Sequence, residues 1–276
     1  MAAWQSGDVT VNGLKLHYTR TGGAKPPLVL VHGFSDDGSC WTPVAQALES
    51  DYDIIMPDAR GHGFSEAPEQ GYTPQEQAAD LKEIITALGL HKPLILGHSM
   101  GAVTTLTLAA MHPTLPGAIL LEDPPAWWHG SGLPPVTSPE QRAKMRESFT
   151  QRKQLTREAL IAEQHRATPT WSDAELGPWA DSKLRLNPNI VELFAPTIPT
   201  SMDWKAILGR VSCPALLITA DPALGAIVTA EQAAALKLLI PQLQVVHIPD
   251  AGHSIHREQM TIYMDSVRKF LASVYL

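Results

Sequence analysis

Short apolar runs alternate with amphipathic stretches along most of the chain. Continuous apolar segments occupy positions 28–31, 54–56, 94–96 and 119–121, and each is bounded by polar or turn-forming residues. Strands that are buried on both faces of a parallel sheet have this pattern, because neither face presents side chains to water. Amphipathic segments of helical length lie between these runs. The pattern therefore predicts alternating strands and helices around a parallel sheet.

Local signals refine this prediction at both ends of the chain. Residues 9–18 alternate apolar and polar around Asn12-Gly13, a dipeptide suited to the positive φ angles of a hairpin turn. Thr73, Pro74 and Glu76 form the sequence signature of a capped helix start, with an apolar face that continues to Leu88. Near the end of the chain we expect two strands, at 216–219 and 245–248. A helix that begins near residue 231 should follow the first strand, and a helix over about 258–275 should follow the second.

The middle of the chain has a different character. From 124 to 204 the strand pattern disappears, and helix-start signals stand at Ser138, Thr156 and Ser172. The length of 276 residues is at the upper edge of what one core usually fills. We therefore expect one α/β core formed by residues 1–123 and 205–276, interrupted by a helical cap over 124–204.

Charge and composition exclude several partners. The chain carries 21 Lys and Arg against 28 Asp and Glu, a net charge of −7, which disfavours nucleic acids and anionic membranes. It contains no apolar stretch of membrane-spanning length and begins without a signal-peptide pattern, so we expect a soluble, cytoplasmic protein. Cys40 and Cys213 are too few for a disulfide framework, and we interpret them as buried thiols.

The strongest chemical signal is the pentapeptide Gly97-His98-Ser99-Met100-Gly101. It follows the apolar run at 94–96 and precedes a helix-forming segment. This is the G-x-S-x-G nucleophile elbow in its required strand–turn–helix context. The glycines allow the close crossing of strand and helix, and the helix N-terminus favours developing negative charge. Ser99 is therefore the candidate nucleophile.

On these residues the chain resembles the α/β-hydrolase superfamily, in particular its esterase-like members with a helical cap. The resemblance extends through His32-Gly33-Phe34, the segment 57–65, the elbow and Asp250-Ala251-Gly252-His253. It implies a mostly parallel sheet flanked by helices, with an inserted helical cap. It also implies a chain order of serine, acid and then histidine.

The resemblance assigns roles to further residues. His253 would be the general base, and the backbone N–H groups of Phe34 and Met100 would form the oxyanion hole. Such a site needs neither a metal nor a cofactor. Because the insertion leaves the sheet at its carboxyl edge, we expect Trp127 and Trp128 to line an apolar substrate pocket. We interpret His32 and His98 as structural residues that hydrogen-bond the backbone.

The acid of the triad is the least determined residue. In most members of the superfamily the acid follows the strand that corresponds here to 216–219. At the position of that acid this chain has Ala223, two residues after Asp221. Others place it after the preceding strand, which here ends in Glu122-Asp123. Strand alternation allows only one of these two to face His253. We expect Glu122 to be the acid, with Asp123 and then Asp221 as the alternatives.

A serine nucleophile selects among the reactions known on this fold. Attack on an epoxide or haloalkane carbon would leave a serine ether that water does not readily cleave, so acyl transfer is favoured. The expected reaction is hydrolysis of a carboxylic ester or lactone of a small to medium apolar substrate. The alternatives are hydrolysis of amide, carbamate or C–C bonds, a slow-turnover small-molecule receptor and cofactor-free oxygenation. The sequence specifies neither the natural substrate nor the oligomeric state.

Overall fold

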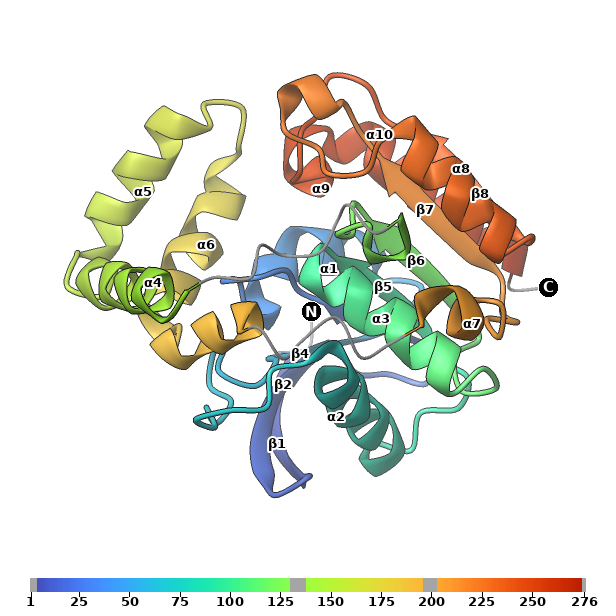
Figure 1. Cartoon of the computed structure of the whole chain (residues 1–276), viewed down its shortest axis with the longest axis horizontal. Coiled ribbons are helices and arrows are strands. Elements are labelled where there is room, and N and C mark those ends of the chain that lie inside the picture. Colours follow the sequence, from blue (N-terminus) through green and yellow to red (C-terminus); the bar gives the residue numbers. More distant parts are fainter. Residues whose placement is uncertain (1–3, 130–137, 196–202, 275–276) are drawn as a thin grey trace.

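The computed structural model describes residues 4–129, 138–195 and 203–274 (Figure 1). Within these residues eight strands form one sheet in the order β1-β2-β4-β3-β5-β6-β7-β8. The first strand pair is an antiparallel hairpin, and β2 also runs antiparallel to β4, whereas the remaining pairs are parallel. The strands are β1 (Gln5–Val11), β2 (Leu14–Arg20), β3 (Pro27–Val31), β4 (Asp53–Pro57), β5 (Leu94–His98), β6 (Ala118–Glu122), β7 (Ala215–Thr219) and β8 (Leu243–His247). The mostly parallel sheet predicted from the apolar runs is present.

Helices cover both faces of this sheet. The α-helices are α1 (Thr42–Leu48), α2 (Pro74–Ala87), α3 (Met100–Met111), α4 (Pro139–Arg152), α5 (Arg157–Ala167), α6 (Asp173–Arg185), α7 (Trp204–Leu208), α8 (Ala230–Leu239), α9 (Ile255–Glu258) and α10 (Met260–Val274). The helix predicted at Thr73 has its capping box, since the Thr73 hydroxyl accepts from the Glu76 N–H and the Glu76 carboxylate accepts from the Thr73 N–H. Four 3₁₀ turns are also described, η1 (Gly38–Trp41), η2 (Trp127–His129), η3 (Pro188–Phe194) and η4 (Pro222–Leu224).

Alternation along each strand divides the core into layers. Leu28 and Leu30 of β3 pack in one apolar cluster with α1 and α10, whereas Val29 and Val31 pack on the opposite face against α2. A further cluster on that second face joins α3 and α8 to β6 and β7. Because both faces are covered, the central strands are buried along their length, apart from half-buried Pro27 at the start of β3.

The C-terminal elements differ in detail from the sequence prediction. The last strand spans 243–247 rather than 245–248, and it forms an edge of the sheet on which Gln244, Val245 and His247 are exposed. The predicted terminal helix corresponds to α10, and its expected end at Tyr275 lies outside the described residues. The short helix α9, which precedes it, was not predicted. Cys40 and Cys213 are buried and free, as expected. No helix in the described part of the chain is long and apolar enough to cross a membrane.

The segment between β6 and β7 contains helices and no strand among its described residues. The helices α4, α5 and α6 form a lobe to one side of the sheet, drawn in yellow-green to yellow in Figure 1. The first turn of the segment, η2, instead packs with α7 against the core cluster of α3 and α8. Residues 130–137 and 196–202 of the predicted cap lie outside the described residues.

Candidate active site

Ser99 lies at a sharp turn between β5 and α3. Its backbone has φ +54° and ψ −117°, a conformation that L-residues rarely adopt. The crossing is so close that a Cβ atom at Gly101 would lie 2.1 Å from the Val31 carbonyl oxygen. A Cβ atom at Gly97 would lie 2.4 Å from the Gly101 carbonyl oxygen. The two glycines of the elbow are therefore required sterically, and they present the Ser99 side chain beyond the end of the strand.

His253 approaches Ser99 from the segment between β8 and α9. Its Nε2 atom lies 2.9 Å from the Ser99 Oγ, and its Nδ1 lies 2.6 Å from Oδ2 of Asp123. An ionised carboxylate can only accept hydrogen bonds, so Nδ1–H donates to Asp123 and leaves the Nε2 lone pair for the serine hydroxyl. The His98 ring donates from Nε2 to the His253 carbonyl oxygen at 2.9 Å, which further fixes this segment. The result is a continuous hydrogen-bonded array of serine, histidine and aspartate.

Asp123 is fully buried and follows β6 directly, with a left-handed φ of +42°. Besides His253, its carboxylate accepts hydrogen bonds from the backbone N–H groups of Ile227 and Val228, at 2.8 and 2.9 Å. These three donors satisfy a carboxylate that burial would otherwise penalise. In most members of the superfamily the loop after β7 supplies the acid itself. Here that loop supplies two backbone N–H groups that bind the Asp123 carboxylate.

The expectation that Glu122 faces His253 is wrong. Glu122 is the last residue of β6 and is fully buried, and its Oε1 accepts from the His256 N–H at 3.0 Å and from the His256 ring at 2.8 Å. Burial by itself would raise the pKa of Glu122, but His256 and His98 lower it to about 2. Because Asp123 leaves the strand in the left-handed region, it turns toward His253 while the Glu122 side chain remains beneath the site.

Asp221, the third candidate acid, is also directed elsewhere. Its carboxylate accepts from the His247 ring at 3.0 Å and from the Asp250 backbone N–H at 2.8 Å. It thereby joins the loop after β7 to the loop after β8. Among the three candidates, the structure therefore brings only Asp123 to His253.

Two backbone N–H groups beside Ser99 are available to a ligand. Met100 is the first residue of α3, and Phe34 follows Gly33 in the loop after β3. A Cβ atom at Gly33 would lie 3.3 Å from the Ser99 Cβ, so this loop runs directly against the elbow. The described residues offer no hydrogen-bond acceptor to either N–H. This is the arrangement expected of an oxyanion hole.

The two histidines interpreted as structural do bind the backbone. His98 donates to the His253 carbonyl oxygen, and burial lowers its pKa to about 3, which keeps the ring neutral. His32 donates from Nδ1 to the Gly33 carbonyl oxygen and accepts from the Ala59 N–H at Nε2. Both thus hold the loops around Ser99.

A cavity of about 240 Å³ opens above Ser99. Its wall comes from α2 and α3, from the loop after β3 and from the segment between β6 and β7, and no charged side chain is among the described residues that form it. The lining residues are Phe34, Pro74, Gln77, Ser99, Met100, Val103, Thr104, Pro125, Trp127, Leu193 and Phe194. Of these lining residues the sequence predicted Trp127, while Phe34 and Met100 were expected as oxyanion donors. Leu193 and Phe194 of η3 were not predicted, because no local pattern places them beside Ser99.

Trp128 does not line this cavity. It is buried against α8, and its indole N–H donates to the Gln232 carbonyl oxygen at 2.9 Å. Trp171 and Trp179 pack together in a separate cluster between α5 and α6. Trp127 is the tryptophan that reaches the cavity, and its ring packs edge-to-face on Trp204 at a centroid distance of 5.7 Å.

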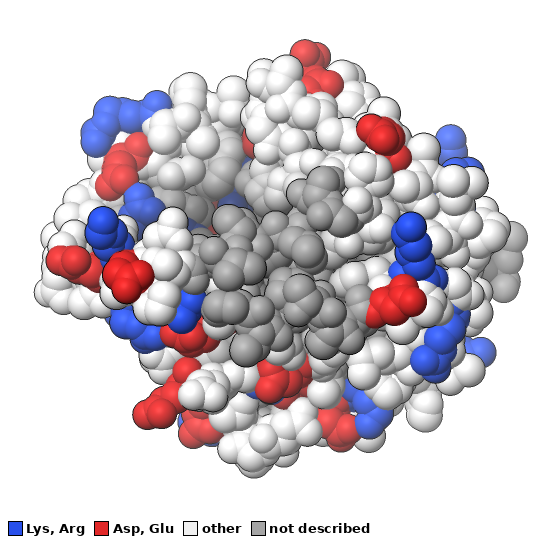
Figure 2. Space-filling model, in the orientation of Figure 1, with Lys and Arg blue, Asp and Glu red and all other residues white. Residues whose placement is uncertain are grey.

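On the face shown in Figure 2, basic and acidic residues are interspersed around the margin rather than gathered by sign. Among the described residues, no group of three or more His, Cys, Asp or Glu side chains could hold a metal ion.

The fold and the serine elbow define an α/β hydrolase, and the chain belongs to the alpha/beta hydrolase fold family, whose model matches residues 26–259. It is 30% identical over 267 residues to N-formylmaleamate deformylase of Pseudomonas putida, covering 96% of each chain. Its fold is similar to that of E-2-(acetamidomethylene)succinate hydrolase, with a TM-score of 0.79, 22% identity and coverage of 98% of this chain and 100% of the other. It is also similar to the enol-lactonase of Burkholderia xenovorans LB400, with a TM-score of 0.74, 25% identity and coverage of 96% and 100%. The protein is therefore a hydrolase of this family.

Proposed function

We propose that this protein is a serine hydrolase that cleaves a carboxylic ester or lactone with an uncharged, apolar acyl group. The observation that carries the proposal is the hydrogen-bonded array Ser99–His253–Asp123 at the floor of an apolar cavity. A serine hydroxyl is a weak nucleophile at neutral pH, and a hydrogen-bonded imidazole activates it. The buried carboxylate orients that imidazole and stabilises its protonated form.

The proposed reaction proceeds in two halves. His253 Nε2 accepts the Ser99 proton as Oγ attacks the ester carbonyl carbon, and the Phe34 and Met100 N–H groups bind the oxyanion that forms. The tetrahedral intermediate expels the alcohol, which takes the proton from His253, and an acyl-enzyme remains. Water, deprotonated by His253, then attacks the acyl carbonyl, the bond to Ser99 Oγ breaks, and His253 returns the proton to Oγ as the acid leaves. Each donor of the oxyanion hole is typically worth about 3 kcal/mol of transition-state stabilisation.

Amide hydrolysis is the second candidate. The relative at 30% identity is named for removal of a formyl group from N-formylmaleamate, and the same three residues would perform that chemistry. A maleamate carries a carboxylate, however, and no cationic side chain is among the described residues that line the cavity here. The apolar lining favours a substrate whose groups within the cavity carry no charge, on either side of the cleaved bond.

A panel of substrates separates these proposals. The purified protein would be offered p-nitrophenyl esters from acetate to decanoate, a set of simple lactones, and N-formylmaleamate, with fluorophosphonate labelling of Ser99 in parallel. We expect labelling and ester turnover, both abolished in Ser99→Ala while the circular dichroism spectrum is unchanged. Turnover of N-formylmaleamate alone would favour the deformylase. Labelling without turnover of any compound would favour a binding protein on the same fold.

A further inference from the structure

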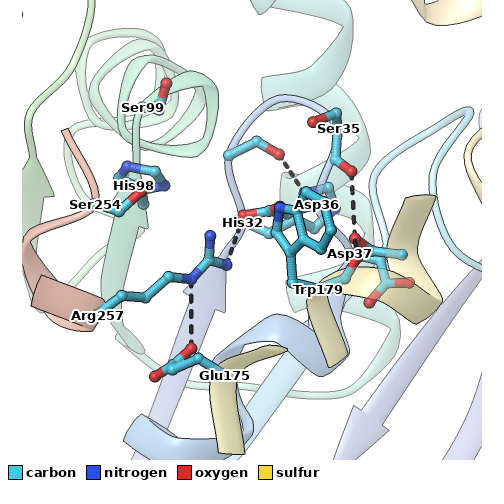
Figure 3. Close-up of polar contacts among 12 residues, drawn as sticks. His32, Ser35, Asp36, Asp37, His98, Ser99, Glu175, Trp179, Ser254 and Arg257 are labelled. Carbon is cyan, nitrogen blue, oxygen red and sulfur yellow. Dashed lines mark hydrogen bonds and ion pairs between the residues drawn. The ribbon is translucent and has the colours of Figure 1, made fainter. Parts of the chain in front are cut away.

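A group of buried charges lies beside the site, and its members are not among the residues that line the apolar cavity. Its centre is Asp36, in the loop after β3 and two residues beyond Phe34. The Asp36 carboxylate pairs with Lys183 Nζ of α6 at 2.7 Å through Oδ1 and with Arg257 Nη2 of α9 at 2.8 Å through Oδ2. All three side chains are at most 7% exposed. Figure 3 shows Asp36 and Arg257 converging below the His98–Ser99 strand end.

Lys183 also binds the backbone that carries Phe34. Its ammonium donates to the Ser35 carbonyl oxygen at 2.7 Å and to the Ser35 hydroxyl at 3.1 Å. Ser35 has a left-handed φ of +65°, and the Asp36 N–H donates back to the Gly33 carbonyl oxygen at 3.2 Å. Phe34 therefore sits inside a tight turn whose far side is held by Lys183. The conformation of this turn sets the direction of the Phe34 N–H.

Arg257 connects the same carboxylate to the segment that carries His253. Its backbone N–H donates to the Ser254 carbonyl oxygen at 3.0 Å, so it lies one turn beyond His253. Its guanidinium stacks over the Trp171 ring at 4.6 Å and pairs with Glu175 of α6 at 3.3 Å. Asp36 thus joins three segments: the turn with the Phe34 N–H, the histidine segment and the helix α6.

The Asp36 carboxyl stays ionised over the working pH range. Burial by itself would raise the pKa of the Asp36 carboxyl, but Arg257 and Lys183 hold it well below its usual range. Buried ion pairs contribute little net stability compared with apolar residues of the same volume, because desolvation offsets their attraction. Their directional hydrogen bonds, however, fix the relative position of the segments they join.

We propose that Lys183, through Asp36 and the Ser35 carbonyl, is a positioning residue that aligns the Phe34 N–H with Ser99 and His253. The inference rests on the proposed function, since it assigns a role in stabilising the oxyanion. A displaced oxyanion donor weakens binding of the transition state and leaves the ester ground state nearly unaffected. The helical segment between β6 and β7 then completes the catalytic geometry in addition to lining the cavity.

The test compares Lys183→Met with a matched control on the same helix. Asp181→Asn removes the exposed ion pair between Asp181 of α6 and Arg157, which spans 2.7 Å and lies outside the buried group around Asp36. For Lys183→Met we expect kcat for the best p-nitrophenyl ester to fall roughly 10- to 100-fold, with KM changed less than about threefold. For Asp181→Asn we expect both constants within about twofold of wild type.

Binding of a transition-state analogue distinguishes positioning from a loss of structure. A trifluoromethyl ketone of the same acyl chain adds Ser99 Oγ to its carbonyl and places an oxyanion in the hole. Its dissociation constant should rise in Lys183→Met by about the factor lost in kcat/KM, and Lys183→Arg should recover most of both. Should Lys183→Met not fold, Lys183→Gln takes its place, because it removes the charge that pairs with Asp36.

The outcomes separate this inference from the function on which it rests. If the wild-type protein hydrolyses no substrate of the panel, the proposed function fails and this inference fails with it. If the wild-type protein is active, and a folded Lys183→Met or Lys183→Gln keeps kcat within about twofold, the positioning role alone is overturned. Equal weakening of the analogue and of ester binding would have the same meaning, because it would indicate a general distortion of the site.

Discussion

Asp123 and Glu122 are neighbours in the chain, and their carboxylates are held by different histidines. Asp123 binds His253 and two backbone amides, whereas Glu122 binds both the backbone and the ring of His256. One residue therefore completes the hydrogen-bonded array, and the other anchors the helix that follows His253. Adjacent acids of the same charge thus contact different histidines because the backbone turns between them.

Amide substitutions separate these two roles. Asp123→Asn should lower kcat on the order of 10³- to 10⁴-fold with a modest change in KM, because the imidazolium loses its partner. Glu122→Gln should instead lower the free energy of unfolding by roughly 1–3 kcal/mol and affect kcat far less. Steady-state kinetics and urea unfolding of both variants measure this. The reverse pattern, a fully active Asp123→Asn beside an inactive Glu122→Gln, would contradict the assignment.

The sequence could locate the serine and the histidine more easily than the acid. Ser99 lies in a motif whose spacing has a steric cause, and His253 follows a recognisable strand. Alternation of side chains correctly implied that only one of Glu122 and Asp123 could face His253, but it holds only within the strand, and Asp123 lies one residue beyond it at φ +42°. One signal was available: aspartate adopts the left-handed region more readily than glutamate.

At the scale of elements, two 3₁₀ turns determine the shape of the cavity. Trp127 belongs to η2, directly after β6, and Leu193 and Phe194 end η3 just before the chain returns toward the core. Within η2, Trp127 lines the cavity while Trp128 packs on α8. Of two successive residues in one short turn, Trp127 thus contributes to the wall of the cavity and Trp128 contributes to packing against α8.

This division predicts different consequences for two adjacent tryptophans. Trp127→Ala enlarges the cavity, so the ratio of kcat/KM for p-nitrophenyl octanoate to that for the acetate should rise, by about tenfold. Trp128→Ala should leave this ratio unchanged and lower stability by about 3–5 kcal/mol, because it empties a packed site and removes a hydrogen bond. Chain-length profiles and thermal unfolding provide the measurements. A shifted profile in Trp128→Ala, or an unshifted one in Trp127→Ala, would contradict the assigned lining.

Helices and strands with strong local signals were predicted well, and those defined by tertiary contacts were not. The capping box at Thr73 specifies its own helix start, whereas α7 and α9 are only 5 and 4 residues long and depend on packing. The buried charges of Asp36, Lys183 and Arg257 could not be foreseen either. Their partners lie 147 and 221 positions apart in the chain, and no local pattern links them.

At the scale of the whole molecule, buried neutral histidines make stability depend on pH. Burial lowers the pKa of His98 to about 3 and that of His62 to about 3, from an ordinary value of 6.5. The unfolded chain therefore binds more protons than the folded one between these values. Each histidine contributes stability that is present above pH 6.5 and is lost as the pH falls toward 3.

We expect the free energy of unfolding to decrease between pH 6.5 and 4.5, by up to about 1.4 kcal/mol per pH unit for each of these histidines. Glu122 adds a loss only below about pH 4.5, because its pKa is lowered to about 2. Glu175, whose pKa burial raises, acts in the opposite direction. Urea unfolding at several pH values tests this, with His62→Gln as the comparison. An identical slope in wild type and variant would show that His62 does not contribute.

The order of the site residues along the chain has a practical consequence. Phe34, Ser99, Met100 and Asp123 all precede the turn between α4 and α5, whereas His253 follows it. In a chain with its acid after β7, acid and base would lie together in the second half. Here a break in that turn would leave Ser99 and Asp123 on one fragment and His253 on the other, so each fragment would lack part of the proposed catalytic array. Neither fragment would hydrolyse substrate by itself, and activity would return only when the two associate. A split-enzyme sensor requires this property.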